Sequence, residues 1–368
     1  MHAAFEVGVL AAVLERMEAK PEPQFELMGL SGTSAGALCA LMVWYGLDSP
    51  GGSPGNAIIQ LENFWNDFLA RPGAETVLDR LTYGALCVEE SEVPWLGLYA
   101  PIFGLNPRGA IYRAFARLLP SLSVRQNYFD LNALLEAHCP NIDAAIRKAS
   151  TRLLIGATEV VNGFETVFDS AATTPEVEYW HQRLPLTLPG IAASGTLPAF
   201  REAQYIEGCY YWDGLYSQNP PIRDFVSDYR NAPEEIWILR INPQQWPYLP
   251  TTNGEIQDRE NELIGNLSLH KDLDFILRVN TWRARLTGND KDLVFEVLGQ
   301  NPVVVRTIKM REDLVNELSL ASKFDRSPAC MSRLRDDGYR FATAWLAAWP
   351  GVPQYPDDAG YPRLPRIP

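Results

Sequence analysis

The segment Gly32-Thr33-Ser34-Ala35-Gly36 limits the folds open to this chain more than any other part of its sequence. It matches the pattern GxSxG, in which two glycines let a strand turn abruptly into a helix and hold the central serine on a strained corner. Residues 25–30 form a short apolar run typical of a strand, and residues 37–45 are apolar nearly all round, as in a buried helix. This arrangement predicts an α/β fold with Ser34 as a nucleophile.

Other periodic patterns agree with an α/β fold. Apolar residues recur at helical spacing from Ala3 to Lys20, with Glu and Lys on the other side. Asn162-Gly163 lies between two alternating runs, 152–159 and 165–168, which predicts a β-hairpin. The apolar run 236–241 is typical of a central strand of a sheet.

Length and composition allow one large domain with an appended region. The chain has 368 residues, 46% of them hydrophobic, which is enough to bury a large core. We expect a hydrolase-like α/β domain over residues 1–245, a helical extension over 246–349 and a proline-rich tail over 350–368. The clearest helical patterns of the extension are 273–286 and 331–349.

The charge of the chain restricts its partners. A net charge of -13, without a cluster of Lys and Arg, repels the phosphate backbone, so nucleic acid is excluded as an expected partner. An acidic protein can still meet a membrane through apolar surface, or at a neutral or cationic interface.

Five scattered cysteines without a CxxC pair indicate reduced thiols. With neither a signal peptide nor a spanning segment in the pattern, we expect a cytoplasmic protein that can contact a membrane peripherally.

The identity of the base decides what Ser34 can do, because a serine hydroxyl is a weak nucleophile until its proton is taken. The usual base is histidine. With Asp213 as the acid in the order serine, acid, histidine, only His270 would follow it in the chain, and its surroundings are typical of the start of a surface helix. His138 and His181 precede Asp213 and have no recognisable catalytic setting, and His2 is the remaining histidine.

A carboxylate is the alternative base. Tyr211-Trp212-Asp213-Gly214 places Asp213 at the end of a short aromatic strand, just before a turn. An Asp-Gly pair on its own is a common turn without catalytic meaning. Its significance therefore depends on the neighbouring sequence.

The neighbouring sequence resembles the patatin-like phospholipase family. The segment 191–200 contains A-S-x-x-x-P, the segment 210–214 contains Asp-Gly, and Asn219-Pro220 follows. Together with GxSxG and with Gly8-Val9-Leu10 of the first helix, these blocks occur in the order found in that family. The resemblance spans about residues 1 to 245, and the helical remainder resembles the C-terminal extension of some bacterial members.

The resemblance implies a fold, a reaction and a site. The fold is a three-layer α/β/α sandwich, and the reaction is hydrolysis of phospholipid or other lipid acyl esters without a metal or other cofactor. By this resemblance Ser34 is the nucleophile and Asp213 the base of a Ser-Asp dyad, and Gly214 belongs to the Asp-Gly motif. A carboxylate in a dry site can act as such a base.

The sequence departs from the family at two places. Leu215 stands where the family has a small residue after Asp-Gly. Met1 aligns just after the family's first strand and its glycine-rich loop, whose N–H groups form the oxyanion hole, and loss of even one such donor slows turnover a hundredfold or more. The sequence favours an upstream start over a degenerate homologue, and a non-catalytic module that binds lipid or protein is the alternative function.

One further segment has two interpretations. Residues 87–105 combine an acidic run with aromatic and aliphatic residues, punctuated by Gly and Pro. The segment is either an irregular loop packed on the core or an entrance or lid for acyl chains.

Overall fold

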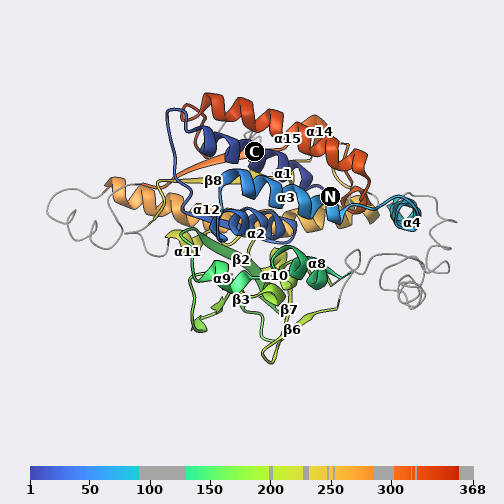
Figure 1. Cartoon of the computed structure of the whole chain (residues 1–368), viewed down its shortest axis with the longest axis horizontal. Coiled ribbons are helices and arrows are strands. Elements are labelled where there is room, and N and C mark those ends of the chain that lie inside the picture. Colours follow the sequence, from blue (N-terminus) through green and yellow to red (C-terminus); the bar gives the residue numbers. More distant parts are fainter. Residues whose placement is uncertain are drawn as a thin grey trace, which may run out of the picture.

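The chain folds around a mixed β-sheet flanked by helices (Figure 1). The computed structural model describes residues 1–90, 130–198, 202–226, 232–246, 248–251, 253–285, 302–315, 317–319 and 321–355. Most of the segment 87–105 and the end of the tail therefore lie outside the described residues.

The described helices fall at both ends of the chain and between the strands. The α-helices are α1 (Ala4–Ala19), α2 (Ala35–Asp48), α3 (Pro54–Phe68), α4 (Ala74–Glu90), α8 (Leu131–His138), α9 (Ile142–Ile146), α10 (Leu188–Ser194), α11 (Arg223–Val226), α12 (Asn253–Arg285), α14 (Glu312–Val315) and α15 (Pro328–Ala348). The short 3-10 helices are η2 (Gly214–Tyr216) and η3 (Ala321–Phe324).

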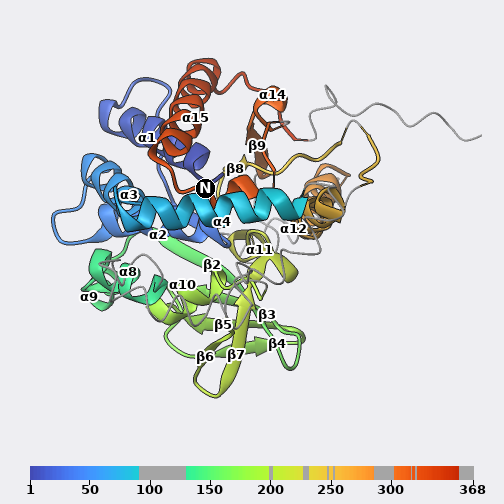
Figure 2. The ribbon, with the colours of Figure 1, turned by 90° about the vertical axis from the view of Figure 1, so that its right-hand side faces the viewer.

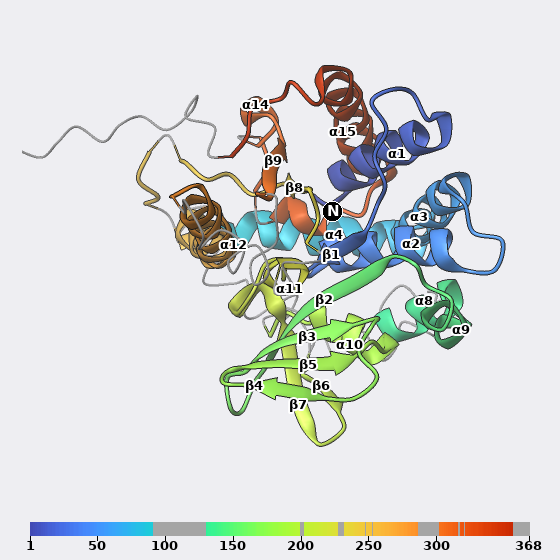
Figure 3. The same cartoon turned by 90° about the vertical axis from the view of Figure 1, so that its left-hand side faces the viewer.

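The strands form a larger and a smaller sheet. They are β1 (Gly29–Gly32), β2 (Arg152–Glu159), β3 (Glu165–Asp169), β4 (Glu176–Glu178), β5 (His181–Pro185), β6 (Gln204–Ile206), β7 (Cys209–Asp213), β8 (Glu235–Arg240) and β9 (Val304–Lys309). Within the described chain the larger sheet has seven strands, in the order β4-β5-β3-β2-β7-β6, with β1 pairing in parallel with β2. Strands β3 to β7 form the end of the molecule opposite α1 and α15 (Figures 2 and 3).

Several sequence predictions are confirmed. The helix expected over 3–20 is α1, and the buried helix after GxSxG is α2. β2 and β3 form the predicted antiparallel hairpin, with Gly163 at φ 77° in its turn. A positive φ is readily adopted by glycine, which explains the Asn-Gly signal.

Consecutive residues of β2 face different layers. Ile155 and Ala157 are fully buried in the main core beside α2. A Cβ at Gly156, between them, would lie 2.6 Å from Oγ1 of Thr33 and 3.1 Å from the carbonyl oxygen of Gln218, on the side of η2. Because α2 and α10 pack against β2 on one side, while η2 contacts both β2 and α12, the sheet lies between helical layers. The fold is the predicted α/β sandwich with a C-terminal helical extension.

The C-terminal helix α15 packs closely along α1. A Cβ at Gly8 of α1 would lie 1.9 Å from the carbonyl oxygen of Arg335, and one at Gly338 of α15 would lie 2.1 Å from that of Phe5. Leu334 and Leu346 of α15 are buried in the same core as α1. Glycines on both helices thus permit a backbone contact that larger residues would prevent.

The strand before the nucleophile begins later than predicted. Pairing with β2 starts at Gly29, whereas residues 25–28 are not a strand. Phe25 packs instead against Trp237 and Trp349, with ring centroids 4.8 and 5.7 Å apart. This tertiary contact with two aromatic residues overrides the apolar strand pattern.

The predicted strand 236–241 forms as β8, but its expected central position is wrong. β8 pairs in parallel with β9, and this pair is a separate two-stranded sheet in the described chain. β9 lies in the part of the chain that was predicted to be helical. A cavity of about 1630 Å³ is lined by residues of both β1 and β8, so it separates the two sheets.

Candidate active site

Ser34 occupies a strained corner between β1 and α2. Its backbone has φ 58° and ψ −127°, a conformation that costs a residue with a side chain about 1–3 kcal/mol. A Cβ at Gly32 would lie 2.4 Å from the carbonyl oxygen of Gly36, so the turn requires glycine there. The next residue, Ala35, begins α2. These features fit the nucleophile elbow that the motif predicted.

Asp213 ends β7 and is fully buried. Its Oδ1 accepts a hydrogen bond of 2.9 Å from the Leu215 N–H, while Oδ2 forms no hydrogen bond of ordinary geometry within the described chain. Burial raises the pKa of Asp213 to about 7, and the Leu215 N–H and the Ser34 hydroxyl offset only part of this rise. The fold therefore brings Asp213 and Ser34 together, with one carboxylate oxygen available to the serine.

The glycine after Asp213 is required by packing. A Cβ at Gly214 would lie 2.5 Å from the carbonyl oxygen of Gly156 in β2. Leu215, the departure from the family pattern, reaches α12, where its Cδ1 lies 2.7 Å from the position that a Cβ at Gly265 would take. Gly265 thus leaves room for the larger side chain.

A short segment that begins with the last residue of α10 holds both Ser34 and Asp213. Oγ of Ser194 accepts a hydrogen bond of 2.9 Å from the Ser34 N–H. The carbonyl oxygen of Thr196 accepts one of 3.0 Å from the Asp213 N–H. Ser194 and Thr196 are fully buried, which protects both bonds from water. The sequence marked this segment by its A-S-x-x-x-P pattern, but gave no role to Ser194.

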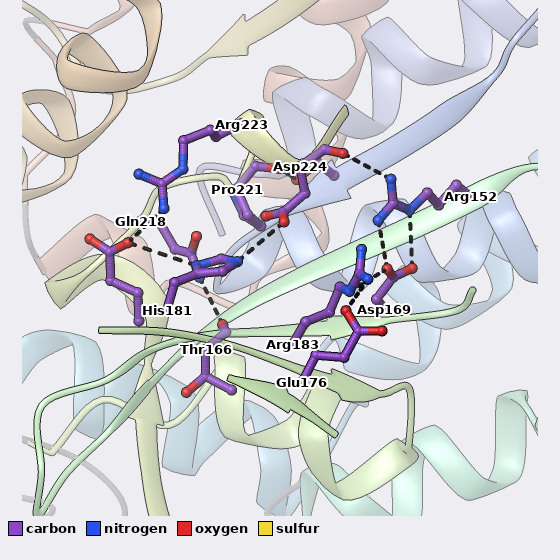
Figure 4. A network of polar contacts seen from close by, with 12 residues as sticks. Arg152, Thr166, Asp169, Glu176, His181, Arg183, Gln218, Pro221, Arg223 and Asp224 are labelled. Atoms are coloured by element: carbon purple, nitrogen blue, oxygen red, sulfur yellow. Dashed lines mark hydrogen bonds and ion pairs between the residues drawn. The ribbon is translucent and has the colours of Figure 1, made fainter. Parts of the chain in front are cut away.

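The loop after η2 is tied to the nucleophile strand. Oγ1 of Thr33 donates 2.9 Å to the carbonyl oxygen of Gln218, and Oγ of Ser31 donates 2.6 Å to that of Pro221. Nε2 of Gln218 donates 2.8 Å to the carbonyl oxygen of Thr166 in β3 (Figure 4). These bonds fix the loop that follows Asp213 against the strand that leads to Ser34.

An ion-pair network next to these hydrogen bonds links α11 to the sheet (Figure 4). Nη2 of Arg152 lies 2.7 Å from Oδ2 of Asp169, and Nη1 donates 2.8 Å to the carbonyl oxygen of Asp224. Oδ1 of Asp224 in turn lies 3.2 Å from Nε2 of His181, so α11 is held to the sheet. The hydrogen bond to His181 helps to keep the pKa of Asp224 below its usual range, despite burial.

All four histidines make hydrogen bonds away from Ser34. The expectation that His270 begins a surface helix is wrong, because it lies inside α12 with Nε2 2.9 Å from Nη2 of Arg240. Burial lowers the pKa of His270, and Arg240 lowers it further. The other three pairs are His2 with Ser322, His138 with Asp67, and His181 with Asp224. This geometry gives a Ser-His-Asp triad no support.

The cavity that separates the sheets also reaches Ser34. Its lining near α1 and α2 is largely apolar and includes Leu10, Val13, Leu38 and Trp65. Such a lining suits an acyl chain more than a polar ligand.

A second buried carboxyl group, which the sequence did not identify as buried, lines the same cavity. Glu6 was expected on the polar side of the first helix, but its side chain lies against α2 and is only 8% exposed. Its Oε2 lies 3.6 Å from the position that a Cβ at Gly36 would take. Burial raises the pKa of Glu6 to about 7.

No group of three or more His, Cys, Asp or Glu residues in the described chain is arranged to hold a metal ion. None of its helices is long and apolar enough to cross a membrane. The five cysteines are all free, as the sequence predicted.

The fold and the elbow define an α/β sandwich protein of the kind that carries a serine on a strand-to-helix turn. The family model described as patatin-like phospholipase matches residues 1–226. The chain therefore belongs to the patatin-like phospholipase family, whose members hydrolyse lipid esters. A search of curated proteins found no match.

Proposed function

We propose that this chain is a serine lipid acyl hydrolase of the phospholipase A or esterase type, with Ser34 and Asp213 as its catalytic dyad. The observation that carries the proposal is the fully buried carboxyl group of Asp213 beside the hydroxyl of a strained serine. A base with a pKa of about 7 is half ionised at neutral pH, and it is basic enough to assist removal of a serine proton.

The reaction proceeds in two halves. Asp213 takes the hydroxyl proton as Oγ of Ser34 attacks the ester carbonyl, and it then gives that proton to the departing alcohol. In the second half Asp213 takes a proton from water, whose oxygen attacks the acyl-enzyme. The carboxylic acid leaves as the Ser34–acyl bond breaks, and the proton returns to Ser34.

Two neighbouring features support the acyl transfer. The N–H of Ala35 stands at the first turn of α2, so it is a suitable donor to the oxyanion of the tetrahedral intermediate. The apolar lining of the cavity, including Leu38 and Trp65, gives a dry environment for the acyl chain.

Hydrolysis of a phosphatidylcholine and of a soluble short-chain ester tests the proposal. Ser34→Ala and Asp213→Asn are each expected to lower kcat/KM by at least about a thousandfold, because the nucleophile and its base act together and neither is effective alone. His270→Ala is the matched control and retains activity. Retained activity in either dyad variant contradicts the dyad, and a folded chain that binds lipid without any turnover points to the binding module instead.

A further inference from the structure

Three β-turns meet at one edge of the larger sheet. β5 begins beside β3, with His181 opposite Glu165, so the turn between β4 and β5 adjoins the turn between β2 and β3. The N–H of Val160 donates 2.8 Å to the carbonyl oxygen of Tyr210, which places the turn between β6 and β7 on the other side. The three turns therefore form one continuous edge.

The same edge lies at the end of the sheet toward which β1 and β2 run, beyond the catalytic residues. β1 runs parallel to β2 and ends with Gly32 opposite Ile155, and Asp213 lies opposite Ala157. β2 then continues for two residues to Glu159, which is roughly 7 Å at about 3.3 Å per residue, and the turn that holds Val161 follows. Exposed Glu202, which lines the cavity, lies two residues before β6, so the start of β6 adjoins the cavity while its end leads into the turn between β6 and β7.

Large apolar and aromatic side chains are exposed on or beside all three turns. They form a surface that we name the turn edge: Val161, Tyr179, Trp180, Tyr205 and Tyr210. Tyr179 is 86% exposed and Trp180 is 69% exposed. The rings of Tyr205 and Tyr210 lie 5.0 Å apart, so they present a joint aromatic face. Tyr and Trp favour the boundary between lipid and water, where an apolar ring and a polar group are both accommodated.

The charges around the turn edge are negative. Two exposed carboxylates, neither of them in an ion pair within the described residues, flank it: Glu178 and Glu207. The nearby cations are instead engaged, since Arg183 pairs with Glu176 and Arg223 with Glu165. Aromatic faces and carboxylates both attract quaternary ammonium groups, whereas an anionic lipid surface repels the carboxylates.

We propose that the turn edge docks the protein on a zwitterionic membrane, with its aromatic rings and carboxylates facing choline head groups. This proposal rests on the proposed function in one respect, because docking would present membrane esters to Ser34. Docking itself requires no turnover. The turn edge therefore has a role distinct from that of the catalytic dyad.

Flotation with large unilamellar vesicles tests the proposal on the full chain. We expect it to bind phosphatidylcholine vesicles at least about tenfold more tightly than phosphatidylglycerol vesicles. The double variant Trp180→Ser/Tyr205→Ser is expected to lose at least tenfold of the binding to phosphatidylcholine. The control Trp282→Ser/Tyr248→Ser, which changes residues 51% and 57% exposed elsewhere, is expected to bind like the parent.

Two further measurements separate docking from catalysis. The turn-edge variant is expected to hydrolyse a soluble monomeric ester at the parental rate, and Ser34→Ala is expected to bind vesicles like the parent. Failure of the parent to bind phosphatidylcholine, a preference for phosphatidylglycerol, or full binding by the turn-edge variant overturns the docking proposal. Docking through the turn edge without ester hydrolysis contradicts the proposed function and leaves docking intact.

Discussion

The N–H of Ser34 donates a hydrogen bond of 2.9 Å to Oγ of Ser194, which is fully buried at the end of α10. The strained backbone of Ser34 gives this N–H no helical partner, because the residue precedes the first turn of α2. Thr196, two residues further on, accepts from the N–H of Asp213. One segment therefore sets the relative position of the two residues that we propose as the dyad.

Ser194→Ala is expected to lower kcat by about ten- to a hundredfold with little change in KM. The substitution leaves the partly buried N–H of Ser34 without its acceptor, which costs roughly 1–3 kcal/mol and lets the elbow shift. Thr187→Ala is the control, because Thr187 caps the same helix α10 through Gly190 without touching Ser34. A loss of activity that merely follows a loss of thermal stability, in both variants alike, would argue against a positioning role.

The rate of hydrolysis of a neutral soluble ester should rise as pH rises through about 7. Asp213 must be ionised to accept the serine proton, and burial raises its pKa to about 7, so below that pH it is mostly protonated and inactive. The measurement is kcat/KM between pH 5 and 9.

A second group could produce the same profile, because the pKa of Glu6 is also raised to about 7. Glu6→Gln removes that titration and is expected to keep the rise in rate. A flat profile in Glu6→Gln would show that the rise in rate follows the ionisation of Glu6 and not that of Asp213.

Ser34→Gly is expected to be more stable than Ser34→Ala by about 1 kcal/mol. The φ of 58° and ψ of −127° strain any residue with a Cβ, and glycine relieves this strain although it adds freedom to the unfolded chain. The free energy of unfolding in urea, measured for both inactive variants, is the readout. Equal stability would show that the elbow stores no strain.

Gly338→Ala is expected to destabilise the fold by about 2 kcal/mol or more, because a Cβ there would lie 2.1 Å from the carbonyl oxygen of Phe5. Urea unfolding again measures the effect. Gly84→Ala in α4 is the control, since a Cβ at Gly84 meets nothing within 4 Å, and helix propensity predicts a gain of about 0.5–1 kcal/mol. Similar results for the two variants would contradict the close packing of α1 and α15.

Local patterns were sufficient to predict α1, α2 and the hairpin of β2 and β3. In each case the pattern depends on residues near one another in the chain, such as Gly163 in the hairpin turn. The motif and the family resemblance also led to Ser34 and Asp213, whose proximity in the structure is as expected. Their catalytic roles stay predictions.

Features that depend on distant contacts could not be predicted in this way. Ser194 contacts Ser34 across 160 positions of the chain, so no local pattern assigns it a role. The late start of β1 reflects packing of Phe25 on Trp237, and the burial of Glu6 depends on its contact with Gly36 of α2. These outcomes follow from the tertiary arrangement.

Labelling with a fluorescent fluorophosphonate probe tests the central claim most directly, because the probe reacts with activated serines. The account predicts one label per folded chain, mapped to Ser34 by peptide mass spectrometry, absent in Ser34→Ala and at least about a hundredfold slower in Asp213→Asn. No labelling of the folded chain, or labelling that persists in Ser34→Ala, would contradict it.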